Sequence, residues 1–596
     1  YSKKGEKVVA MNHAAIERGM QDVHEVQVPA SWKDADPTEA VEKATGDRPE
    51  LVDYVNNVLK PVNAFRGKKL TVGDFKDYAD GTVPQGSAAY EKRGIAVDVP
   101  EWNPANCIQC NFCSYVCPHA VIRPVVMTPE ELAKAPEGTK SKDMNGLPGL
   151  KFSVTVSTLD CTGCGSCAQV CPGMKGEKAL VLKPIDTQRA GQAVFDYGKT
   201  IAPKPEVLEK FKATTVKGSQ FRQPLLEFSG ACAGCGETPY ARLATQLFGD
   251  RMFIANATGC TSIWGGSEPA TPYTVNREGH GPAWSNSLFE DNAEYGYGMS
   301  LGQDAVRGRL VEYVNGILDS GSASEGLKDA GKNYLATITD SGANQPAAEA
   351  LISELEKVQN GSSDIAEYAK KILADKDYLA KKSVWIFGGD GWAYDIGFGG
   401  LDHVIASGAN VNILVFDTEV YSNTGGQASK STPMGSVAQF AATGKAVKKK
   451  DLAEIAMTYG YVYVAHVAMG ADYNQCLKAF HEAESYNGPS LIIAYAPCIN
   501  HGIKGGMTIA QQEEKKAVAS GYWNNYRYDP RRADEGKNPF TLDSKAPTES
   551  YHDFIMGEVR YNSLTRSFPE RAQVLFKRAE EDAAAKYEEL EKLAKQ

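Results

Sequence analysis

The sequence predicts an α/β fold, in which a parallel-sheet domain follows a small, cysteine-rich α+β domain. Two observations carry this prediction. Between residues 226 and 530, apolar segments of strand length alternate with helical segments, as in a parallel sheet with crossover helices. Between residues 91 and 190, eight cysteines stand in two short repeats among prolines and glycines, which is typical of a small module built around metal.

These patterns divide the chain into five expected segments. They are the end of a preceding domain plus a linker (1–90), the cysteine-rich domain (91–190), a linker (191–225), the sheet domain (226–530) and a C-terminal extension that packs on another subunit or domain (531–596). Within the sheet domain, the helical stretch 302–382 is expected to be an excursion from the sheet. Because the first residue is Tyr rather than Met, we expect the chain to be the C-terminal part of a longer protein.

Composition excludes several classes of protein. The net charge of −10 argues against nucleic-acid binding. The longest apolar runs, such as 490–496, are far shorter than the ~18 residues that a membrane span needs. The clustering of most of the 13 cysteines favours metal in a reducing, cytoplasmic compartment over disulfides. Cys476 lies on a helical pattern apart from the others and is expected to be a buried core thiol.

The two cysteine repeats predict a ferredoxin-like pair of 4Fe–4S clusters. Both have the spacing C-x2-C-x2-C-x3-C-P, in which three close thiolates bind one cluster and the fourth reaches the other. A structural zinc site needs two pairs of ligands and gives no reason for this spacing. The predicted ligand sets are Cys107, Cys110, Cys113 and Cys171 for one cluster, and Cys161, Cys164, Cys167 and Cys117 for the other.

A third set of cysteines is scattered along the predicted sheet domain. Cys232 and Cys235 form a C-x2-C pair at its start, and Cys260 and Cys498 each lie in a loop after an apolar strand. Loops that follow parallel strands collect on one edge of the sheet, so these four thiols could meet there. The spacing alone leaves three readings open: a third cluster, buried free thiols, or a zinc site that includes His501.

Two strand ends predict a site for thiamine diphosphate and Mg²⁺. The first strand runs into Gly389-Asp390-Gly391, and the second, about thirty residues later, runs into a polar loop that begins near Thr418. Asp390, the Thr418 hydroxyl and the Val420 carbonyl offer the hard oxygen ligands that Mg²⁺ prefers. Gly389 and Gly391 would let the backbone approach the phosphates, next to a helix N-terminus. The alternative is a plain strand-to-helix turn with Asp390 as the N-cap.

In this order, the cysteine sets, "GDGWAYDIG" and "YSNTGGQ" resemble the 2-oxoacid:ferredoxin oxidoreductase family, and within it the C-terminal half of the long single-chain pyruvate enzymes. The resemblance spans nearly the whole chain. It implies that Cys232, Cys235, Cys260 and Cys498 hold a third 4Fe–4S cluster next to the cofactor, and that Asp390, Thr418 and the Val420 carbonyl bind Mg²⁺. It also implies that Asn423 lies close to the reacting thiazolium and substrate, and that Ile263 lies near the cofactor.

The resemblance also implies an activity: oxidative decarboxylation of pyruvate with coenzyme A to acetyl-CoA and CO2, reversible in principle. Electrons would pass through three clusters to ferredoxin or flavodoxin. In this family the full enzyme is expected to be a homodimer. The part of the active site on the N-terminal domains would come from missing domains or from a separate chain. The alternatives are the same chemistry on another 2-oxoacid, or an electron-transfer subunit of a different redox complex.

A short basic run offers a docking patch for an acidic partner. Lys445, Lys448, Lys449 and Lys450 stand in "GKAVKKKD", and a ferredoxin would favour a locally basic surface. The alternative, which we expect, is an ordinary solvated face.

Overall fold

The computed structural model describes residues 2, 5–34, 43–267 and 270–596. These fall into two compact units, residues 1–52 and 53–596. The first unit contains helix α1 (Glu6–Gln21), none of whose residues is buried. The second contains all the predicted site residues. Among the described residues, no helix has both the length and the apolar character needed to cross a bilayer.

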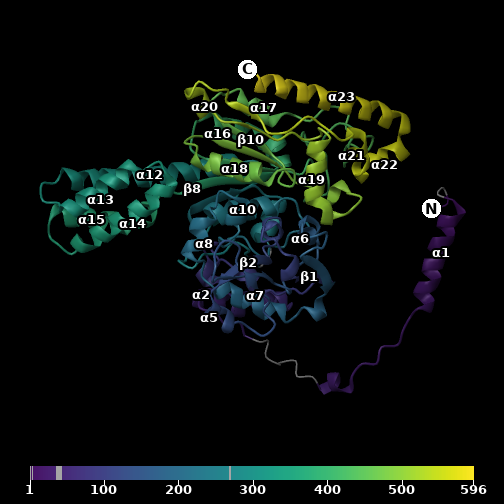
Figure 1. Ribbon diagram of the computed structural model, residues 1–596, viewed down its shortest axis with the longest axis horizontal. Helices are drawn as coiled ribbons and strands as arrows, with labels where there is room; N and C mark the ends of the chain where they lie inside the picture. Colours follow the sequence, from purple (N-terminus) through teal and green to yellow (C-terminus); the bar gives the residue numbers. More distant parts are fainter. Residues whose placement is uncertain (1, 3–4, 35–42, 268–269) are drawn as a thin grey trace. The chain divides into compact units, whose positions relative to one another are not determined.

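An eight-stranded sheet forms the centre of the second unit, with strand order β13-β12-β10-β11-β9-β8-β6-β7 (Figure 1). The strands from β7 to β10 in this order are parallel, and β12 and β13 add an antiparallel edge that was not predicted. The α/β fold with its parallel sheet is therefore confirmed. The strands are β6 (Met252–Asn256), β7 (Ala283–Asn286), β8 (Ser383–Gly389), β9 (Asn412–Asp417), β10 (Tyr463–Val467), β11 (Ser490–Tyr495), β12 (Tyr526–Tyr528) and β13 (Phe540–Leu542).

The central strands are apolar throughout because helices cover both faces of the sheet. Every residue of β9 and β11 is buried, which is the pattern expected of a parallel sheet between two helical layers. Alternate side chains enter two separate cores: Ile386 packs in one, and Trp385 and Phe387 pack in the other. The covering helices include α10 (Thr238–Phe248) and α18 (Tyr473–Ser485) for one core, and α16 (Phe398–Ala406), α17 (Leu452–Met457) and α23 (Pro569–Ala594) for the other.

The C-terminal segment packs on this sheet. Residues 531–596, which we expected to cover another subunit or domain, carry strand β13 and helices α21 (Tyr551–Met556), α22 (Val559–Ser567) and α23. Leu575, Phe576 and Leu590 of α23 are buried in the same core as strands β8, β9 and β11. The highly charged helix is therefore amphipathic, with its apolar stripe turned toward the sheet.

A helical insert separates β7 from β8 in the sequence. It consists of α12 (Asn292–Asp319), α13 (Glu325–Ala336), α14 (Ser341–Val358) and α15 (Asp364–Ala374), and it extends away from the sheet (Figure 1). Its helices enclose a hydrophobic core of their own, with Leu310, Leu351 and Leu355 at its centre. The predicted helical excursion at 302–382 is thus confirmed, although its first helix begins at Asn292.

The cysteine-rich domain is a small α+β fold. Strand β1 (Asp98–Trp102) pairs with β5 (Leu180–Pro184), and the other sheet has the order β2-β4-β3. Two short helices, α4 (Phe112–Tyr115) and α6 (Ser166–Val170), each lie within a cysteine run and pack on each other. The remaining elements are β2 (Ile122–Met127), α5 (Pro129–Ala133), β3 (Lys142–Asp143), β4 (Lys151–Val156), and helices α7 (Gly191–Thr200), α8 (Pro205–Lys210) and α9 (Val216–Ser219) in the expected linker.

Candidate functional site

Cysteines of the two repeats lie close to one another in the structure. Burial, and then the negative charge of neighbouring Cys110, Cys107 and Cys171, raises the pKa of the Cys113 thiol. In the second set, Cys117, Cys161, Cys164 and Cys167 line one small cavity. Burial, followed by the charges of Cys164, Cys117, Cys161 and Cys113, raises the pKa of Cys167. Cys171 thus stands with the first run and Cys117 with the second, so each run lends its last thiol to the other.

Matching turns arrange the two runs. The backbone N–H of Gln109 points at the Cys107 sulfur, and that of Gly163 points at the Cys161 sulfur, both at 3.4 Å. Gln109 and Gly163 both have left-handed backbone, with φ of 61° and 70°. These N–H groups are the donors that stabilise negative charge on sulfur in a cluster site. A thiolate set with such donors fits an anionic iron–sulfur cluster.

The third set also converges. Burial and then Glu237 raise the pKa of Cys260, the Ser422 hydroxyl lowers it, and Cys235 and Cys498 make smaller contributions that raise it. Burial raises the pKa of Cys498 to about 12, and the charge of Cys232 contributes to this rise. Cys260 follows β6 and Cys498 follows β11, and both strands end at the same edge of the sheet. Cys260 and Cys498 therefore lie at one sheet edge, and the C-x2-C loop reaches it, because the Gly236 N–H donates to the Pro497 carbonyl at 3.2 Å.

His501 is not available as a zinc ligand. Its Nε2 donates to the Thr418 carbonyl at 2.7 Å, and its Nδ1 accepts from the Cys498 N–H at 3.4 Å, so both ring nitrogens are occupied. In the described part of the chain, no three His, Cys, Asp or Glu side chains converge tightly enough to hold a single metal ion. A four-iron cluster is larger than an ion and needs thiolates that stand farther apart.

The proposed Mg²⁺ ligands lie at the neighbouring strand ends of β8 and β9. Asp390 Oδ1 accepts from the Thr418 N–H at 3.2 Å and from the Thr418 hydroxyl at 2.9 Å. The same hydroxyl also lies 2.9 Å from the Val420 carbonyl. The other carboxylate oxygen of Asp390 accepts from the Ser429 hydroxyl at 2.6 Å. Three hard oxygens thus share one small space, and Ser429 is a neighbour that the sequence did not reveal.

Asp390 does not act as a helix N-cap. It begins the helical turn Gly391–Ile396, but its side chain makes no capping hydrogen bond. The carboxylate is 1% exposed and forms no ion pair with a described residue. Burial and the neighbouring Asp417 raise its pKa. A buried carboxylate in this position needs a compensating cation, so the site fits a divalent ion.

The remaining predicted residues surround these strand ends. Ile263 follows Cys260 on the turn after β6 and is 40% exposed. Asn423 is exposed in the loop after β9; its neighbour Ser422 has its hydroxyl 3.2 Å from the Cys260 sulfur. That contact joins the third thiol set to the loop of the proposed cofactor site.

The two glycines of Gly389-Asp390-Gly391 have different surroundings. A side chain at Gly389 would meet nothing closer than the Phe416 carbonyl, at 3.9 Å, so space is open there. A side chain at Gly391 would clash with the Tyr421 ring at 2.5 Å. Gly389 therefore has the room that close approach of a ligand requires, while Gly391 is needed for packing.

The basic run is neither a docking patch nor a solvated face. Lys449 pairs with the buried Asp417 at 2.7 Å and with the buried Glu419 at 3.0 Å. Lys445 donates to the Ser429 carbonyl, and Lys450 to the Tyr394 carbonyl. Both predictions for this run are wrong for these three lysines, because they turn inward to buried acceptors behind the Asp390 site. Lys448 alone is exposed.

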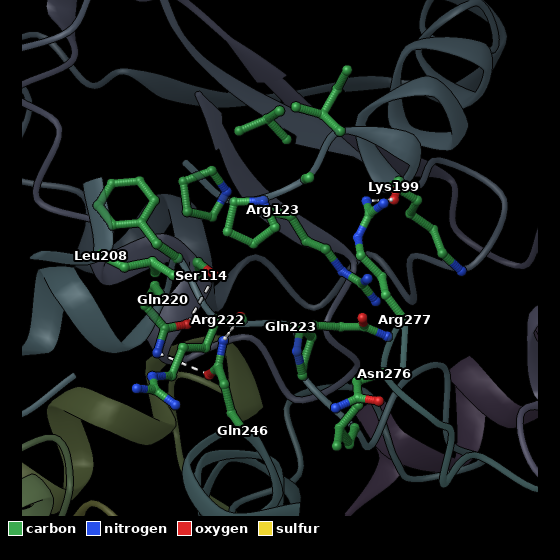
Figure 2. Close-up of a pocket in the computed structure, with 18 of the residues that line it drawn as sticks. Ser114, Arg123, Lys199, Leu208, Gln220, Arg222, Gln223, Gln246, Asn276 and Arg277 are labelled. Atoms are coloured by element: carbon green, nitrogen blue, oxygen red, sulfur yellow. Dashed lines mark hydrogen bonds between the residues drawn. The ribbon is translucent and has the colours of Figure 1, made fainter. Parts of the chain in front are cut away.

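A separate cavity of about 330 Å³ lies beside the cysteine-rich domain (Figure 2). Basic and amide side chains line much of it, including Arg123, Lys199, Arg222, Gln220 and Gln246. None of the predicted cofactor or cluster ligands lines this cavity.

Three family models match the chain. Residues 106–174 match a 4Fe-4S dicluster domain, and residues 369–494 match the C-terminal TPP binding domain of thiamine pyrophosphate enzymes. Residues 38–96 match a domain of unknown function named EKR. The 4Fe-4S dicluster match contains the paired cysteine runs, and the TPP-binding match contains the ends of strands β8 and β9.

Curated relatives match the whole chain. It is 56% identical to pyruvate:ferredoxin oxidoreductase of Moorella thermoacetica and 53% identical to pyruvate-flavodoxin oxidoreductase of Klebsiella pneumoniae, with 100% of the chain covered in each case. The chain is homologous throughout to the pyruvate:ferredoxin and pyruvate-flavodoxin oxidoreductases. This confirms the resemblance. The chain spans about half the length of these relatives, 50% and 49% respectively. It is also 46% identical to the NADP-dependent pyruvate dehydrogenase of Euglena gracilis, over 98% of the chain and 32% of that protein.

Proposed function

We propose that this chain is the cofactor-binding and electron-transfer part of a pyruvate:ferredoxin or pyruvate-flavodoxin oxidoreductase. The enzyme would oxidatively decarboxylate pyruvate with coenzyme A to acetyl-CoA and CO2, reversibly in principle. Two electrons would leave per turnover, one at a time, to ferredoxin or flavodoxin.

One observation carries the proposal. The loops that carry Cys235, Cys260 and Cys498 reach the edge of the sheet where Asp390, Thr418 and the Val420 carbonyl are in contact. The contact between Cys260 and Ser422 joins the two groups. A pure electron-transfer subunit has no need of this junction, whereas an oxidative decarboxylase needs a cluster beside its cofactor.

Each group of residues would have a separate role. Asp390, Thr418 and the Val420 carbonyl would hold Mg²⁺ against the diphosphate, and Gly389 would leave room for it. Cys232, Cys235, Cys260 and Cys498 would bind a third 4Fe–4S cluster, and the ferredoxin-like sets would bind two more. When bound, thiamine diphosphate supplies a ring that accepts the electron pair released as CO2 leaves. Asn423 would lie near the substrate, and Ile263 near the cofactor ring.

Other groups must complete the enzyme. The aminopyrimidine end of the cofactor and part of the substrate site would come from further N-terminal domains or from a separate chain, in a homodimeric and cytoplasmic enzyme. Buried thiols poised for clusters require the reducing conditions of such a compartment.

The proposal is tested on the complete, anaerobically isolated enzyme. Reduction of a viologen dye should require pyruvate and coenzyme A together, and Asp390→Asn should abolish it while leaving iron content unchanged. Dye reduction with 2-oxoglutarate or an aryl pyruvate in place of pyruvate would establish the alternative substrate. Iron without any 2-oxoacid-dependent reduction would establish the electron-transfer subunit instead.

A further inference from the structure

A guanidinium lies fully buried beside the cysteine-rich domain. Arg242 of α10 is 1% exposed, in a helix whose residues are all buried. It forms no ion pair with any Asp or Glu in the described ranges 43–267 and 270–596. Its hydrogen-bond acceptors are neutral: the Tyr115 carbonyl, Gln220 Oε1 at 3.1 Å and Gln246 Oε1 at 2.8 Å. A buried cation held only by neutral groups is strongly unfavourable.

The amides that hold Arg242 form a network visible in the wall of the cavity in Figure 2. Gln220 donates to Gln246 at 3.1 Å and accepts from Ser114 at 2.9 Å. Ser114 directly follows Cys113, so the network runs from the first cysteine run to α10. Arg242 itself does not line the cavity. The amides therefore separate its charge from solvent.

The cysteine site lies next to this charge, because the Tyr115 carbonyl that accepts from Arg242 is two residues before Cys117. Burial lowers the pKa of the Arg242 guanidinium, and Arg123 lowers it further as a like charge; the Cys117 thiol and then the Tyr115 phenol raise it. The phenol donates to the Tyr473 carbonyl at 3.2 Å and is neutral. The Nε of Arg242 is buried and has no hydrogen-bond partner. A cluster bound through Cys117 would bring negative charge to this place.

We propose that Arg242 raises the reduction potential of the cluster bound by Cys161, Cys164, Cys167 and Cys117. This inference rests on the proposed function, because it requires a cluster there. Reduction by one electron makes the cluster more negative. A nearby buried cation stabilises that reduced form, and burial prevents salt from screening the interaction. The other ferredoxin-like set has a weaker counterpart in Lys217, which acts on Cys110 and Cys107 from a partly exposed position.

The test is an anaerobic redox titration with dithionite, followed by electron paramagnetic resonance, together with an iron count for each variant. Arg242→Gln removes the charge. Gln246→Glu keeps the guanidinium and neutralises it with a carboxylate in the place of the present amide oxygen. Arg242→Lys keeps a positive charge. Arg251→Gln is the matched control, because Arg251 lies just beyond the same helix and pairs with Asp250 and Glu484 rather than with a thiol.

Arg242→Gln and Gln246→Glu should lower the midpoint potential of the same single cluster. At the wild-type midpoint, the oxidised-to-reduced ratio of that cluster should rise at least tenfold, which corresponds to about 59 mV for a one-electron couple. Arg242→Lys should lower this midpoint potential less, and Arg251→Gln should leave the midpoint potentials unchanged. If Arg242→Gln does not retain iron, Gln246→Glu and Arg242→Lys decide the question.

Three results would overturn the inference. They are unchanged midpoints at full iron content, equal shifts in the lysine and glutamine variants, and loss of iron in all variants at Arg242 and Gln246. The last result would make Arg242 a residue for cluster assembly. Absence of iron at these cysteines in the wild type would instead refute the proposed function, so the two failures are distinguishable.

Discussion

Single buried carboxyl groups give the molecule distinct responses to pH. Glu514 is fully buried, accepts from the Tyr240 hydroxyl at 3.1 Å and from the Gly470 N–H at 2.7 Å, and has no cationic partner among the described residues. Burial raises its pKa from 4.5 to about 8. Between these two values the folded protein binds a proton that the unfolded chain has lost, so stability falls as pH rises.

Glu514→Gln should therefore remove part of this pH dependence. The free energy of unfolding of the wild type should fall relative to that of the variant by up to about 1.4 kcal/mol per pH unit between pH 5 and 8. Denaturant unfolding across this range measures the difference. A constant difference between the two proteins would show that Glu514 is ionised in the folded state.

Glu419 behaves in the opposite way. It pairs with Lys449 at 3.0 Å and with Arg560 at 2.9 Å, and although burial opposes ionisation these cations lower its pKa to about 2. Glu419→Gln would remove the carboxylate that Lys449 and Arg560 share, leaving Asp417 and Glu558 as their partners, and should cost about 1.5–3 kcal/mol of stability. Asp186→Asn is the control, since its pair with Arg189 is exposed and is worth at most about 1 kcal/mol. Equal, small losses in both variants would mean that this network is solvated.

At the scale of elements, the charged C-terminal helix is held by a few apolar side chains. Leu590 of α23 is fully buried against the sheet, whereas Val574 of the same helix is 58% exposed. Leu590→Ala should lower the free energy of unfolding by about 2–5 kcal/mol. Val574→Ala should change it by less than about 0.5 kcal/mol. Similar effects of both substitutions on thermal unfolding would contradict the packing described for α23.

Local patterns could be predicted from the sequence, and distant pairings could not. The cysteine spacing predicted which thiols share a site, because each run is short and the crossover of the last cysteine follows from geometry. The strand ends of β8 and β9 were predicted because apolar runs end in polar loops. The lysines of "GKAVKKKD" were misjudged because their acceptors, Asp417, Glu419 and Tyr394, are separate in the sequence and meet only after the sheet forms.

At the scale of the whole molecule, the proposed electron path depends on three sets of cysteines. Cys235→Ser should lower the iron content from about twelve to about eight per chain, because it removes one ligand of the third cluster. Cys476→Ser should leave it unchanged, because Cys476 is a fully buried core thiol in α18, as predicted. An unchanged iron count in the Cys235 variant would show that this cysteine is not a cluster ligand.

The most direct test of the account is the cofactor content of the anaerobically isolated protein. Iron, acid-labile sulfide and thiamine diphosphate would be measured per copy of this chain. The account predicts about twelve irons and about twelve sulfides, four of each per cluster, together with thiamine diphosphate. About eight irons and no thiamine diphosphate would contradict the junction of cofactor and third cluster, and the chain would then be an electron-transfer subunit.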